Sequence, residues 1–327
     1  MTVFCGRPIF LLCLLTLSLP FHTCRYNRKH PPLRRRILEN VTLCNYQDKF
    51  SEINLQNEPN LEFKNAHFPF FGEQIFRALN YTTKSIIFRR GSVKEVLISS
   101  PVLEVLQVIN TDLVTLNAVP FLNYSLQQLV IRSSKLSQWS PSLRFLRSLE
   151  EIDIAYCSFF YLNMGWFEPF PKLRVLDVAK NILTALDIGP TLNMGALKKF
   201  HLWGNRLEQL QRFPDAFPSI EGVSLSQNRW HCDWLSKARD AIWSMGVVLM
   251  DMDGICQAGW TNNGGLCCRG SEIASTKVPK RKTKAKGIDL ELEQLADVLE
   301  NAAVVNGSVI GMQMGNSVVF LDKPLAV

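Results

Sequence analysis

After residue 24, the 327-residue chain has no apolar run close to the roughly 20 residues that a transmembrane helix needs. Its one long apolar stretch, residues 9–19, follows Arg7 and is typical of the core of a secretory signal peptide. We therefore expect a signal peptide over residues 1–23 and a secreted, extracellular chain that does not span a membrane.

The sequence also lacks the motifs by which enzymes and metal sites are usually recognised. It has no GxSxG nucleophile motif, no HExxH, no phosphate-binding Walker loop and no GxGxxG after a strand. It has no paired CxxC spacing and no cluster among its five histidines. We therefore expect a protein that is not an enzyme, with no catalytic residue, no cofactor and no metal.

An evenly basic surface is lacking as well, although the formal net charge is +7. Twelve basic residues lie in two blocks, over residues 25–36 and 277–286, and removing those twelve charges changes +7 to −5. Both blocks are interpreted first as solvated segments, and no nucleic-acid partner is expected. Binding of these blocks to a polyanion, and proteolytic processing at residues 34–36, are the alternatives.

What the sequence does contain is a repeat with apolar residues at fixed spacing. The copy that begins at Leu173 reads LxxLxVxxNxLxxL, and the next, from Leu197, reads LxxFxLxxNxLxxL. Eight copies place a strand at positions 61, 86, 106, 129, 152, 176, 200 and 223, which are 20 to 25 residues apart. This period is typical of leucine-rich repeats. It predicts an α/β solenoid, a horseshoe of about eight repeats over residues 61–231.

The sixth residue, counted from the strand position of each copy as the first, is expected to hydrogen-bond the buried turn of a neighbouring repeat. In chain order the position holds Ala66, Gly91, Thr111, Ser134, Cys157, Asn181, Asn205 and Asn228. Because the first two lack a side-chain donor, the first two repeats should be less regular. Cys157 is predicted to be a buried, unpaired structural cysteine, and a reactive or interchain thiol is the alternative.

A solenoid must cover the core that is exposed at each of its ends. Residues 24–60 are expected to form a basic segment and an N-terminal cap with a disulfide between Cys24 and Cys44. Residues 232–270 are expected to form a cysteine-containing C-terminal cap, in which residues 237–245 form an amphipathic helix over the last repeat.

The remaining residues are divided into a basic linker, 271–287, and a tail, 288–327. Apolar residues over 288–302 are spaced as in two heptads, fewer than a stable coiled coil needs. The tail is therefore predicted to be irregular, with a short C-terminal helix.

The C-terminal cap carries the more specific signature. Cys232-Asp-Trp-Leu stands where extracellular leucine-rich-repeat caps have Cys-x-Cys, so that Trp234 occupies the place of the second cysteine. Cys256 and the vicinal pair Cys267-Cys268 follow. Up to about residue 269, the chain resembles a short or divergent form of the secreted leucine-rich-repeat immune proteins of mosquitoes.

The resemblance implies innate-immune recognition, or a carrier role for a complement-like thioester protein. It also implies pairing with another leucine-rich-repeat chain through C-terminal cysteines and coiled coils. The alternative function is extracellular adhesion or developmental ligand binding without an immune role.

Two pairing schemes remain open for the four cap cysteines. Adjacent cysteines rarely bond to each other, because the small ring strains the peptide bond between them. Cys267 and Cys268 can each bond to one of Cys232 and Cys256, which closes the cap. Alternatively, at least one vicinal thiol bonds to a second chain, and the resemblance favours this interchain bond.

Two further sets of residues are candidates for modification and for binding. Sequons predict N-glycosylation at Asn40, Asn80, Asn123 and Asn306. The second, fourth and fifth strand positions are expected to face outward on the concave face, where a protein partner would bind. The candidates there are Arg89, Arg132, Asp153, Tyr156, Asp177, His201 and Trp203. Aromatic side chains beside arginine are typical of interface hot spots, and the alternative is an ordinary surface position for Trp203.

Overall fold

The computed structural model describes residues 35–42, 55, 57–120 and 124–270, together with four residues near the C-terminus. The chain divides into two compact units, Met1–Glu272 and Ile273–Val327. In the second unit, β16 (Gln313–Met314) and β17 (Ser317–Val318) pair in an antiparallel hairpin. The predicted signal peptide, the Cys24–Cys44 disulfide, the basic linker, the short C-terminal helix, Asn123 and Asn306 lie outside the described residues.

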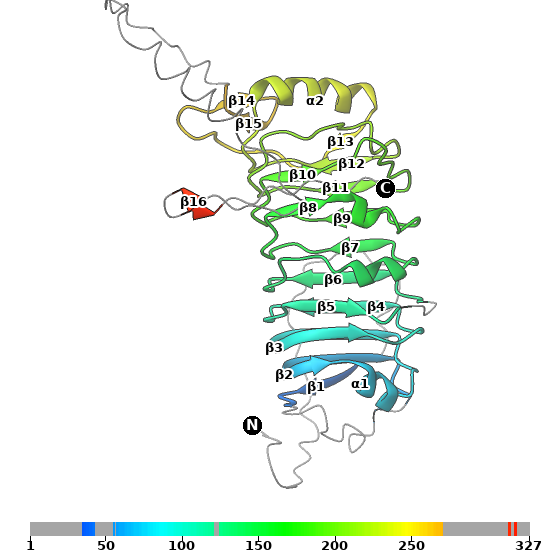
Figure 1. Ribbon diagram of the computed structural model, residues 1–327. Coiled ribbons are helices and arrows are strands. Elements are labelled where there is room, and N and C mark those ends of the chain that lie inside the picture. Colours follow the sequence, from blue (N-terminus) through cyan, green and yellow to red (C-terminus); the bar gives the residue numbers. More distant parts are fainter. Residues whose placement is uncertain are drawn as a thin grey trace, which may run out of the picture. The chain divides into compact units, whose positions relative to one another are not determined.

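Parallel strands stack one above another in the first unit (Figure 1). Their order is β1-β2-β3-β4-β6-β7-β9-β11-β12-β13, and β5 also pairs with β3. The bounds are β1 Arg36–Glu39, β2 Asn60–Phe71, β3 Ser85–Ile98, β4 Val105–Ile109, β5 Thr115–Ala118, β6 Gln128–Arg132, β7 Glu151–Asp153, β9 Val175–Asp177, β11 Lys199–His201, β12 Gly222–Ser224 and β13 Val248–Leu249. Successive strands belong to successive repeats, so the fold is a leucine-rich-repeat solenoid.

The predicted strand positions pair with one another in register along the stack. The paired residues are, in order, Leu61, Ile86, Leu106, Leu129, Ile152, Leu176, Phe200 and Val223. All eight side chains are fully buried. The register follows from the pleat, because a slip of one residue would turn every core side chain to the opposite face of the sheet.

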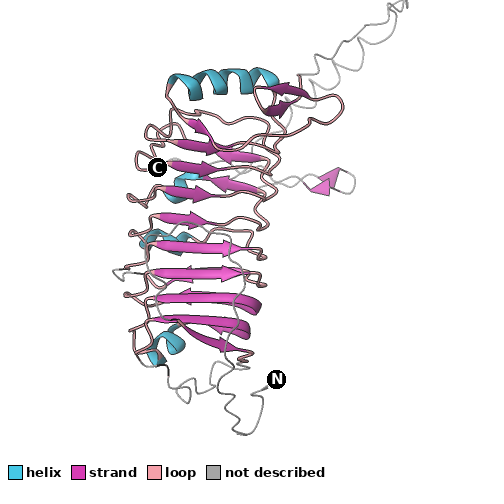
Figure 2. Cartoon of the chain, turned by 180° about the vertical axis from the view of Figure 1, so that it is seen from behind, coloured by secondary structure: helices cyan, strands magenta, loops and turns pink. Residues whose placement is uncertain are grey.

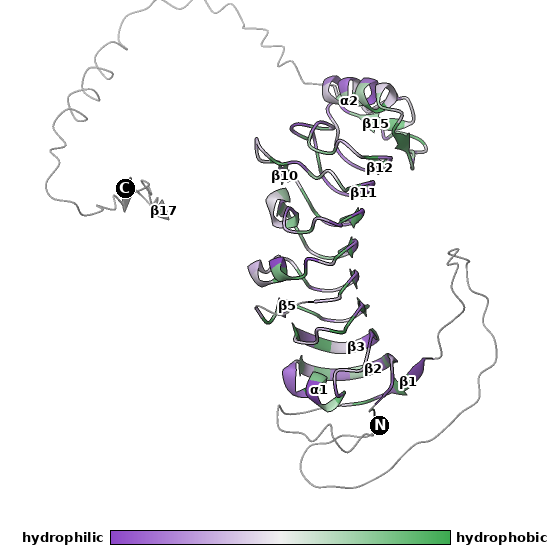
Figure 3. Ribbon diagram, turned by 90° about the vertical axis from the view of Figure 1, so that its right-hand side faces the viewer, coloured by the Kyte–Doolittle hydropathy of each residue, from purple (hydrophilic) through white to green (hydrophobic). Residues whose placement is uncertain are grey.

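The return segments of the repeats form the opposite side of the stack, as β5 and β10 show in Figure 3. They contain the 3₁₀ helices η2 (Pro141–Phe145) and η3 (Met164–Phe167), and the paired strands β8 (Tyr161–Asn163) and β10 (Ala185–Asp187). Figure 2 shows how little of this unit is helical. In the described part of the chain, no helix is both long and apolar enough to cross a membrane.

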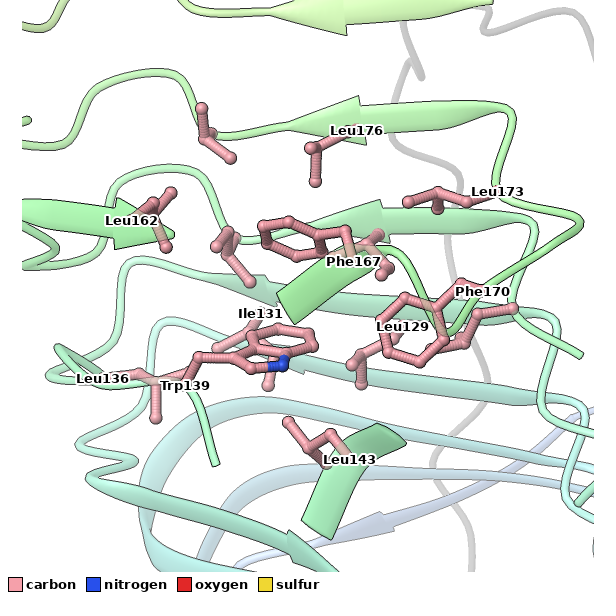
Figure 4. Packing of buried hydrophobic residues seen from close by; sticks show 14 of the residues in the cluster. Leu129, Ile131, Leu136, Trp139, Leu143, Leu162, Phe167, Phe170, Leu173 and Leu176 are labelled. Atoms are coloured by element: carbon pink, nitrogen blue, oxygen red, sulfur yellow. The ribbon is translucent and has the colours of Figure 1, made fainter. Parts of the chain in front are cut away.

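One continuous hydrophobic core lies between the sheet and the return segments (Figure 4). Trp139 and Phe167, from neighbouring repeats, have ring centroids 5.0 Å apart and are almost completely buried. Burial of a large apolar side chain is worth roughly 1.5–3 kcal/mol. No single repeat could enclose these rings, so the repeats stabilise one another through contacts with their neighbours.

The sixth-position asparagines make the predicted hydrogen bonds between neighbouring repeats, and this series of side chains is called the ladder below. Asn205 Nδ2 donates to Val178 O at 3.0 Å and Leu202 O at 2.9 Å, and its Oδ1 accepts from Leu183 N at 3.1 Å. Asn181 and Asn228 make the corresponding bonds in their own repeats. Each asparagine therefore connects buried backbone groups of two consecutive repeats.

Cys157 occupies the same position in its repeat. Its Sγ donates to Ile131 O at 3.4 Å and Ala155 O at 3.6 Å, in the pattern of the asparagines. Burial raises the pKa of the thiol to about 12, which keeps it protonated and unreactive. Cys157 is free, as predicted, but it is half-buried rather than fully buried.

The first two repeats are irregular, in agreement with their missing ladder donors. β2 and β3 are 12 and 14 residues long and continue through the position where later strands turn. Ala66 pairs with Gly91 in this extended register. A Cβ on Gly91, whose φ is +90°, would lie 2.1 Å from Ala66 O. Direct backbone pairing therefore replaces the side-chain ladder here.

A left-handed residue occupies the fifth position of each of the eight repeats, within the long strands β2 and β3 and after the strand in the later repeats. The set is Asn65, Arg90, Asn110, Ser133, Tyr156, Lys180, Gly204 and Gln227, with φ between 52° and 71°. Asn40, after β1, has the same conformation, and β1 pairs with β2 in the same register. A further strand thus extends the sheet within the segment predicted to be the N-terminal cap.

The C-terminal end of the sheet is covered by α2 (Cys232–Ser244), which begins five residues before the predicted helix (Figure 1). Its Leu235, Ala238 and Ile242 are buried against the last repeat. The indole of Trp234 stacks on Trp230, 4.5 Å between centroids, and donates to Leu210 O at 2.9 Å. Trp234 therefore packs over the core in place of the missing second cysteine.

Two aspartates in the segment after β13, the last strand of the sheet, complete the cap. The Asp251 carboxylate accepts hydrogen bonds from the backbone N–H groups of Leu225 and Ser226. The Asp253 carboxylate accepts from Gln227 N and Cys267 N, both at 2.7 Å. In the middle of the stack, backbone N–H groups at this position are bonded to the next repeat. At the end of the stack the two carboxylates accept these hydrogen bonds instead.

The cap cysteines form two disulfides within the chain, Cys232–Cys268 and Cys256–Cys267. The vicinal pair lies on β15 (Leu266–Cys268), which pairs with β14 (Thr261–Asn263) in a hairpin. Successive strand residues point to opposite faces, so adjacent cysteines reach different partners. The expectation of an interchain bond through Cys267 or Cys268 is therefore wrong, and the closed cap is the scheme that the structure has.

Candidate binding site on the concave face

Charged side chains from four successive strands meet on the concave face. Asp153, Asp177 and His201 end β7, β9 and β11 and lie in register. Arg132, at the end of β6, reaches across them: its Nε is 2.5 Å from Asp153 Oδ2, and its Nη2 is 3.3 Å from Asp177 Oδ2. His201 Nδ1 lies 3.0 Å from Ser224 Oγ. Arg132, Asp153 and Asp177 are called the charged cluster below.

The charged cluster perturbs its own ionisation. Burial, and then the neighbouring charge of Asp177, raise the pKa of Asp153 to about 6, whereas Arg132 acts to lower it. Burial lowers the pKa of Arg132, but the two carboxylates outweigh this and leave that pKa raised. Burial also lowers the pKa of His201, so its imidazole is neutral at pH 7.

The stability of the folded chain should depend on pH through Asp153. Since its folded pKa is above the value of an unfolded chain, the folded state binds more protons between about pH 4 and 6. The stabilisation is complete below pH 4 and is lost as the pH rises through about 6. We expect this group to contribute on the order of 2–3 kcal/mol of stability at pH 4 relative to pH 7.

Urea unfolding at pH 4 to 7.5 measures this contribution, with Asp153→Asn as the comparison. The difference in unfolding free energy between the wild type and the variant should change by on the order of 2 kcal/mol over that range. Parallel pH profiles for the wild type and Asp153→Asn would contradict the shifted pKa.

An aromatic cluster adjoins these charges and consists of Tyr156, Lys180, Trp203 and Gln227. The rings of Tyr156 and Trp203 meet edge to face, with centroids 6.0 Å apart and an angle of 82° between their planes. Lys180 Nζ lies 4.7 Å from the centre of the Trp203 ring and donates to Gln227 Oε1 at 2.6 Å. An edge-to-face pair together with a cation–π contact restrains the indole.

The left-handed turns position this aromatic cluster. Tyr156, Lys180 and Gln227 are fifth-position residues, so they repeat at the same point of three turns. Their backbone is fixed to the next repeat, for example by Lys180 N to Trp203 O at 2.8 Å. At Gly204 a Cβ would lie 2.6 Å from Lys180 Cδ, so glycine leaves room for the lysine side chain. Tyr156 remains 46% exposed, and Trp203 is half-buried.

Not every predicted residue belongs to this surface. Arg89 lies near the other end of the stack, where its Nε is 3.0 Å from Glu62 Oε1. Asp153 is only 4% exposed, so a partner would meet it through Arg132. The fourth-position residues Ala155, Ala179 and Ser226, expected to face outward, are buried. Their short side chains do not reach beyond the larger neighbours.

Sequence reasoning left Gln227 out of the candidate residues. Gln227 could have been predicted from its fifth position in the last repeat, because Tyr156 and Lys180 hold the fifth position of their own repeats. Among the predicted glycan sites, Asn40 and Asn80 are exposed and lie at left-handed turns. Their modification stays a prediction.

The chain is thus a leucine-rich-repeat protein with a charged and aromatic surface on the concave face. No protein-family model and no curated protein sequence matches it. The leucine-rich repeat domain of mosquito APL1B is similar in structure, with 18% identity, a TM-score of 0.44, and coverage of 64% of this chain and 72% of that chain.

Two other mosquito structures are similar. The LRIM1/APL1C complex has 17% identity and a TM-score of 0.49 over 82% of this chain and 54% of that chain. The LRIM1 leucine-rich repeat domain has 12% identity and a TM-score of 0.47 over 72% of this chain and 91% of that chain. At these identities the likeness concerns the fold, and the function has to be argued from the site.

Proposed function

We propose that this chain is a secreted protein that binds another protein through the charged and aromatic clusters of its concave face. The observation that carries the proposal is the position of Trp203, half-exposed and held between Tyr156 and Lys180. A restrained aromatic side chain loses little conformational freedom on binding, which is why tryptophan and tyrosine are frequent interface hot spots.

The charged cluster adds specificity to this surface. Arg132 is 44% exposed at its side chain although it pairs with two carboxylates. Its remaining guanidinium donors are oriented by those carboxylates and suit a carboxylate or carbonyl group of the partner. The partner that fits best therefore presents an apolar side chain to Trp203 and an acceptor to Arg132.

The biological role that we propose is innate-immune recognition, or the carriage of a complement-like thioester protein. A second leucine-rich-repeat chain is a further partner in this proposal, held by contacts other than the cap cysteines. The support is the cap signature at Cys232 and the clustered cap cysteines. Transcript induction after infection, and the identity of the haemolymph proteins that co-purify with the native chain, test this role. Constant expression and developmental partners would favour the adhesion or developmental role instead.

Loss of both aromatic rings should weaken binding without unfolding the chain. Tyr156→Ala with Trp203→Ala should reduce affinity for the co-purifying partner by about 2 kcal/mol or more, roughly 30-fold, because hot-spot truncations have costs of this size. The measurement is the equilibrium binding of the purified partner to each immobilised variant.

The matched control removes the same residue types elsewhere. Tyr161→Ala with Trp243→Ala deletes two side chains that are 39% and 87% exposed, on β8 and α2. This control should bind as the wild type does. Equal affinities of the concave double variant and the wild type, with both chains folded, would reject the concave face as the binding site.

A further inference from the structure

Two adjacent cavities lie beside the C-terminal cap. Gln227 of the aromatic cluster lines the first of them, but Tyr156 and Trp203 line neither. The first has a volume of about 570 Å³ and the second about 550 Å³. Both are lined by Arg229, Gln257 and Trp260. Arg206 lines the first, and Arg269 and His231 line the second. The two cavities together are called the cap groove.

The walls of the cap groove are fixed before any ligand binds. One wall continues the repeats, with Arg206 N bonded to Leu183 O and Arg229 N bonded to Leu207 O, each at 2.8 Å. The other wall is the loop that carries Gln257 and Trp260, which the Cys256–Cys267 disulfide closes. A preformed groove does not have to be ordered on binding, which favours affinity.

The cap groove has an excess of positive charge. The guanidinium groups of Arg206 and Arg229 have no ion pair with the residues that the structure describes, and both side chains are exposed. Arg269 adds a third positive charge. Of the two carboxylates present, Asp253 is occupied by two backbone N–H groups, and Glu208 lies 3.3 Å from His231.

The start of α2 lies beside the second cavity. His231 lines the second cavity and precedes the first turn of the 13-residue helix, and its side chain makes no capping hydrogen bond. The first turn of α2 also contains Asp233, whose carboxylate offsets the positive end of the helix dipole, so the positive potential of the groove comes from its arginines. Half-buried Trp260 lines both cavities and contributes an aromatic ring to their walls.

We propose that the cap groove binds an acidic oligosaccharide, with sulfate or carboxylate groups on the arginines and a sugar ring on Trp260. The planar guanidinium group matches both oxyanions by paired hydrogen bonds. An acidic peptide fits less well, because both cavities are open to solvent and neither encloses an apolar pocket for an anchoring side chain. The proposal does not depend on the function proposed for the concave face.

The test is calorimetric titration of the full chain with short probes. A heparin-derived tetrasaccharide carries sulfate and carboxylate, a hyaluronan tetrasaccharide carries carboxylate alone, and a chitin tetrasaccharide is neutral. Binding of the first alone assigns the oxyanion as sulfate, and binding of both acidic probes shows that carboxylate is sufficient. Binding of the neutral probe with equal affinity, or of no oligosaccharide, overturns the proposal.

Variants localise the binding. Arg206→Ala with Arg229→Ala should raise the Kd of the acidic tetrasaccharide at least tenfold, and Trp260→Ala should raise it more than Trp260→Phe does. The charge-matched control Arg147→Ala with Arg174→Ala removes two exposed arginines elsewhere and should change the Kd less than twofold. Equal losses in the two arginine pairs would show that net charge alone attracts the probe and would overturn the site.

Two further measurements separate this proposal from the alternatives. Tyr156→Ala with Trp203→Ala should leave tetrasaccharide binding unchanged, so failure of the concave-face proposal and failure of this one are distinguishable. A tetraglutamate peptide should bind at least tenfold more weakly than the acidic tetrasaccharide. A peptide that binds as tightly, with the same dependence on Arg206 and Arg229, would replace the oligosaccharide as the ligand.

Discussion

Replacement of Asn205 by alanine should destabilise the chain by about 3–5 kcal/mol. The side chain makes three hydrogen bonds, to Val178 O, Leu202 O and Leu183 N, and it is only 6% exposed. Alanine takes the side-chain acceptor from Leu183 N, which costs about 1–3 kcal/mol for a buried group. It also removes one of the two amide hydrogen bonds to each of Val178 O and Leu202 O, at about 0.5–1.5 kcal/mol each, and leaves those from Asn181 and Asn228. Urea unfolding followed by circular dichroism measures the change.

Two comparisons make this prediction specific to the ladder. Asn193→Ala removes an exposed asparagine from a return segment and should change stability by less than about 0.5 kcal/mol. Ser134→Ala, at the same ladder position as Asn205, should cost only about 1 kcal/mol, because its contacts to Thr111 and Arg132 are 3.3 and 3.4 Å long. A cost for Asn205→Ala no greater than that for Ser134→Ala would contradict the ladder.

Loss of the Cys232–Cys268 disulfide should be about as damaging. The bond joins the first residue of α2 to the buried end of β15, across a sequence separation of 36 residues. Cross-linking a loop of this length restricts the unfolded chain by about 4 kcal/mol in the loop-entropy treatment. Cys232→Ala with Cys268→Ala should therefore lower the free energy of unfolding by about that amount.

The second disulfide is the natural comparison. Cys256–Cys267 closes only 11 residues, so its removal should cost about 3 kcal/mol and should leave α2 on the last repeat. The backbone amides of α2 should therefore exchange faster with solvent in the variant that lacks Cys232–Cys268, and not in the variant that lacks Cys256–Cys267. Peptide mapping of the unreduced chain must recover both bonds. A Cys232–Cys256 peptide, or equal exchange in α2 for both variants, would refute this assignment.

The repeats could be predicted because their information is local. The position of a residue such as Leu176 or Asn181 within its repeat can be predicted from its distance to the next apolar residue. The same spacing occurs in each copy. The period therefore placed the strands, the buried column and the ladder without knowledge of any long-range contact. The irregular first repeats were predictable for the same reason, since Ala66 and Gly91 lack ladder donors.

The binding surface could be predicted only in part. The expectation that the fourth and fifth strand positions face outward placed Tyr156 and Trp203 on one face. Their edge-to-face contact and the position of Lys180 depend on left-handed turns, which the residue types at those positions do not predict. Ordinarily such turns favour glycine or asparagine, and here they also hold arginine, tyrosine, lysine and glutamine. The repeated backbone pairing imposes the turn on whatever residue stands there.

The sequence by itself determined the solenoid, the positions of its strands and its ladder of asparagines, because a periodic pattern repeats the same local physics. Only the tertiary structure decided the cysteine pairing, the burial of Asp153 beneath Arg132, and the use of Asp251 and Asp253 to close the last strand. Each of these joins groups more than ten residues apart at an end of the array or across several strands. Composition and spacing do not predict these contacts, because they depend on how the stacked backbone brings side chains distant in the sequence together.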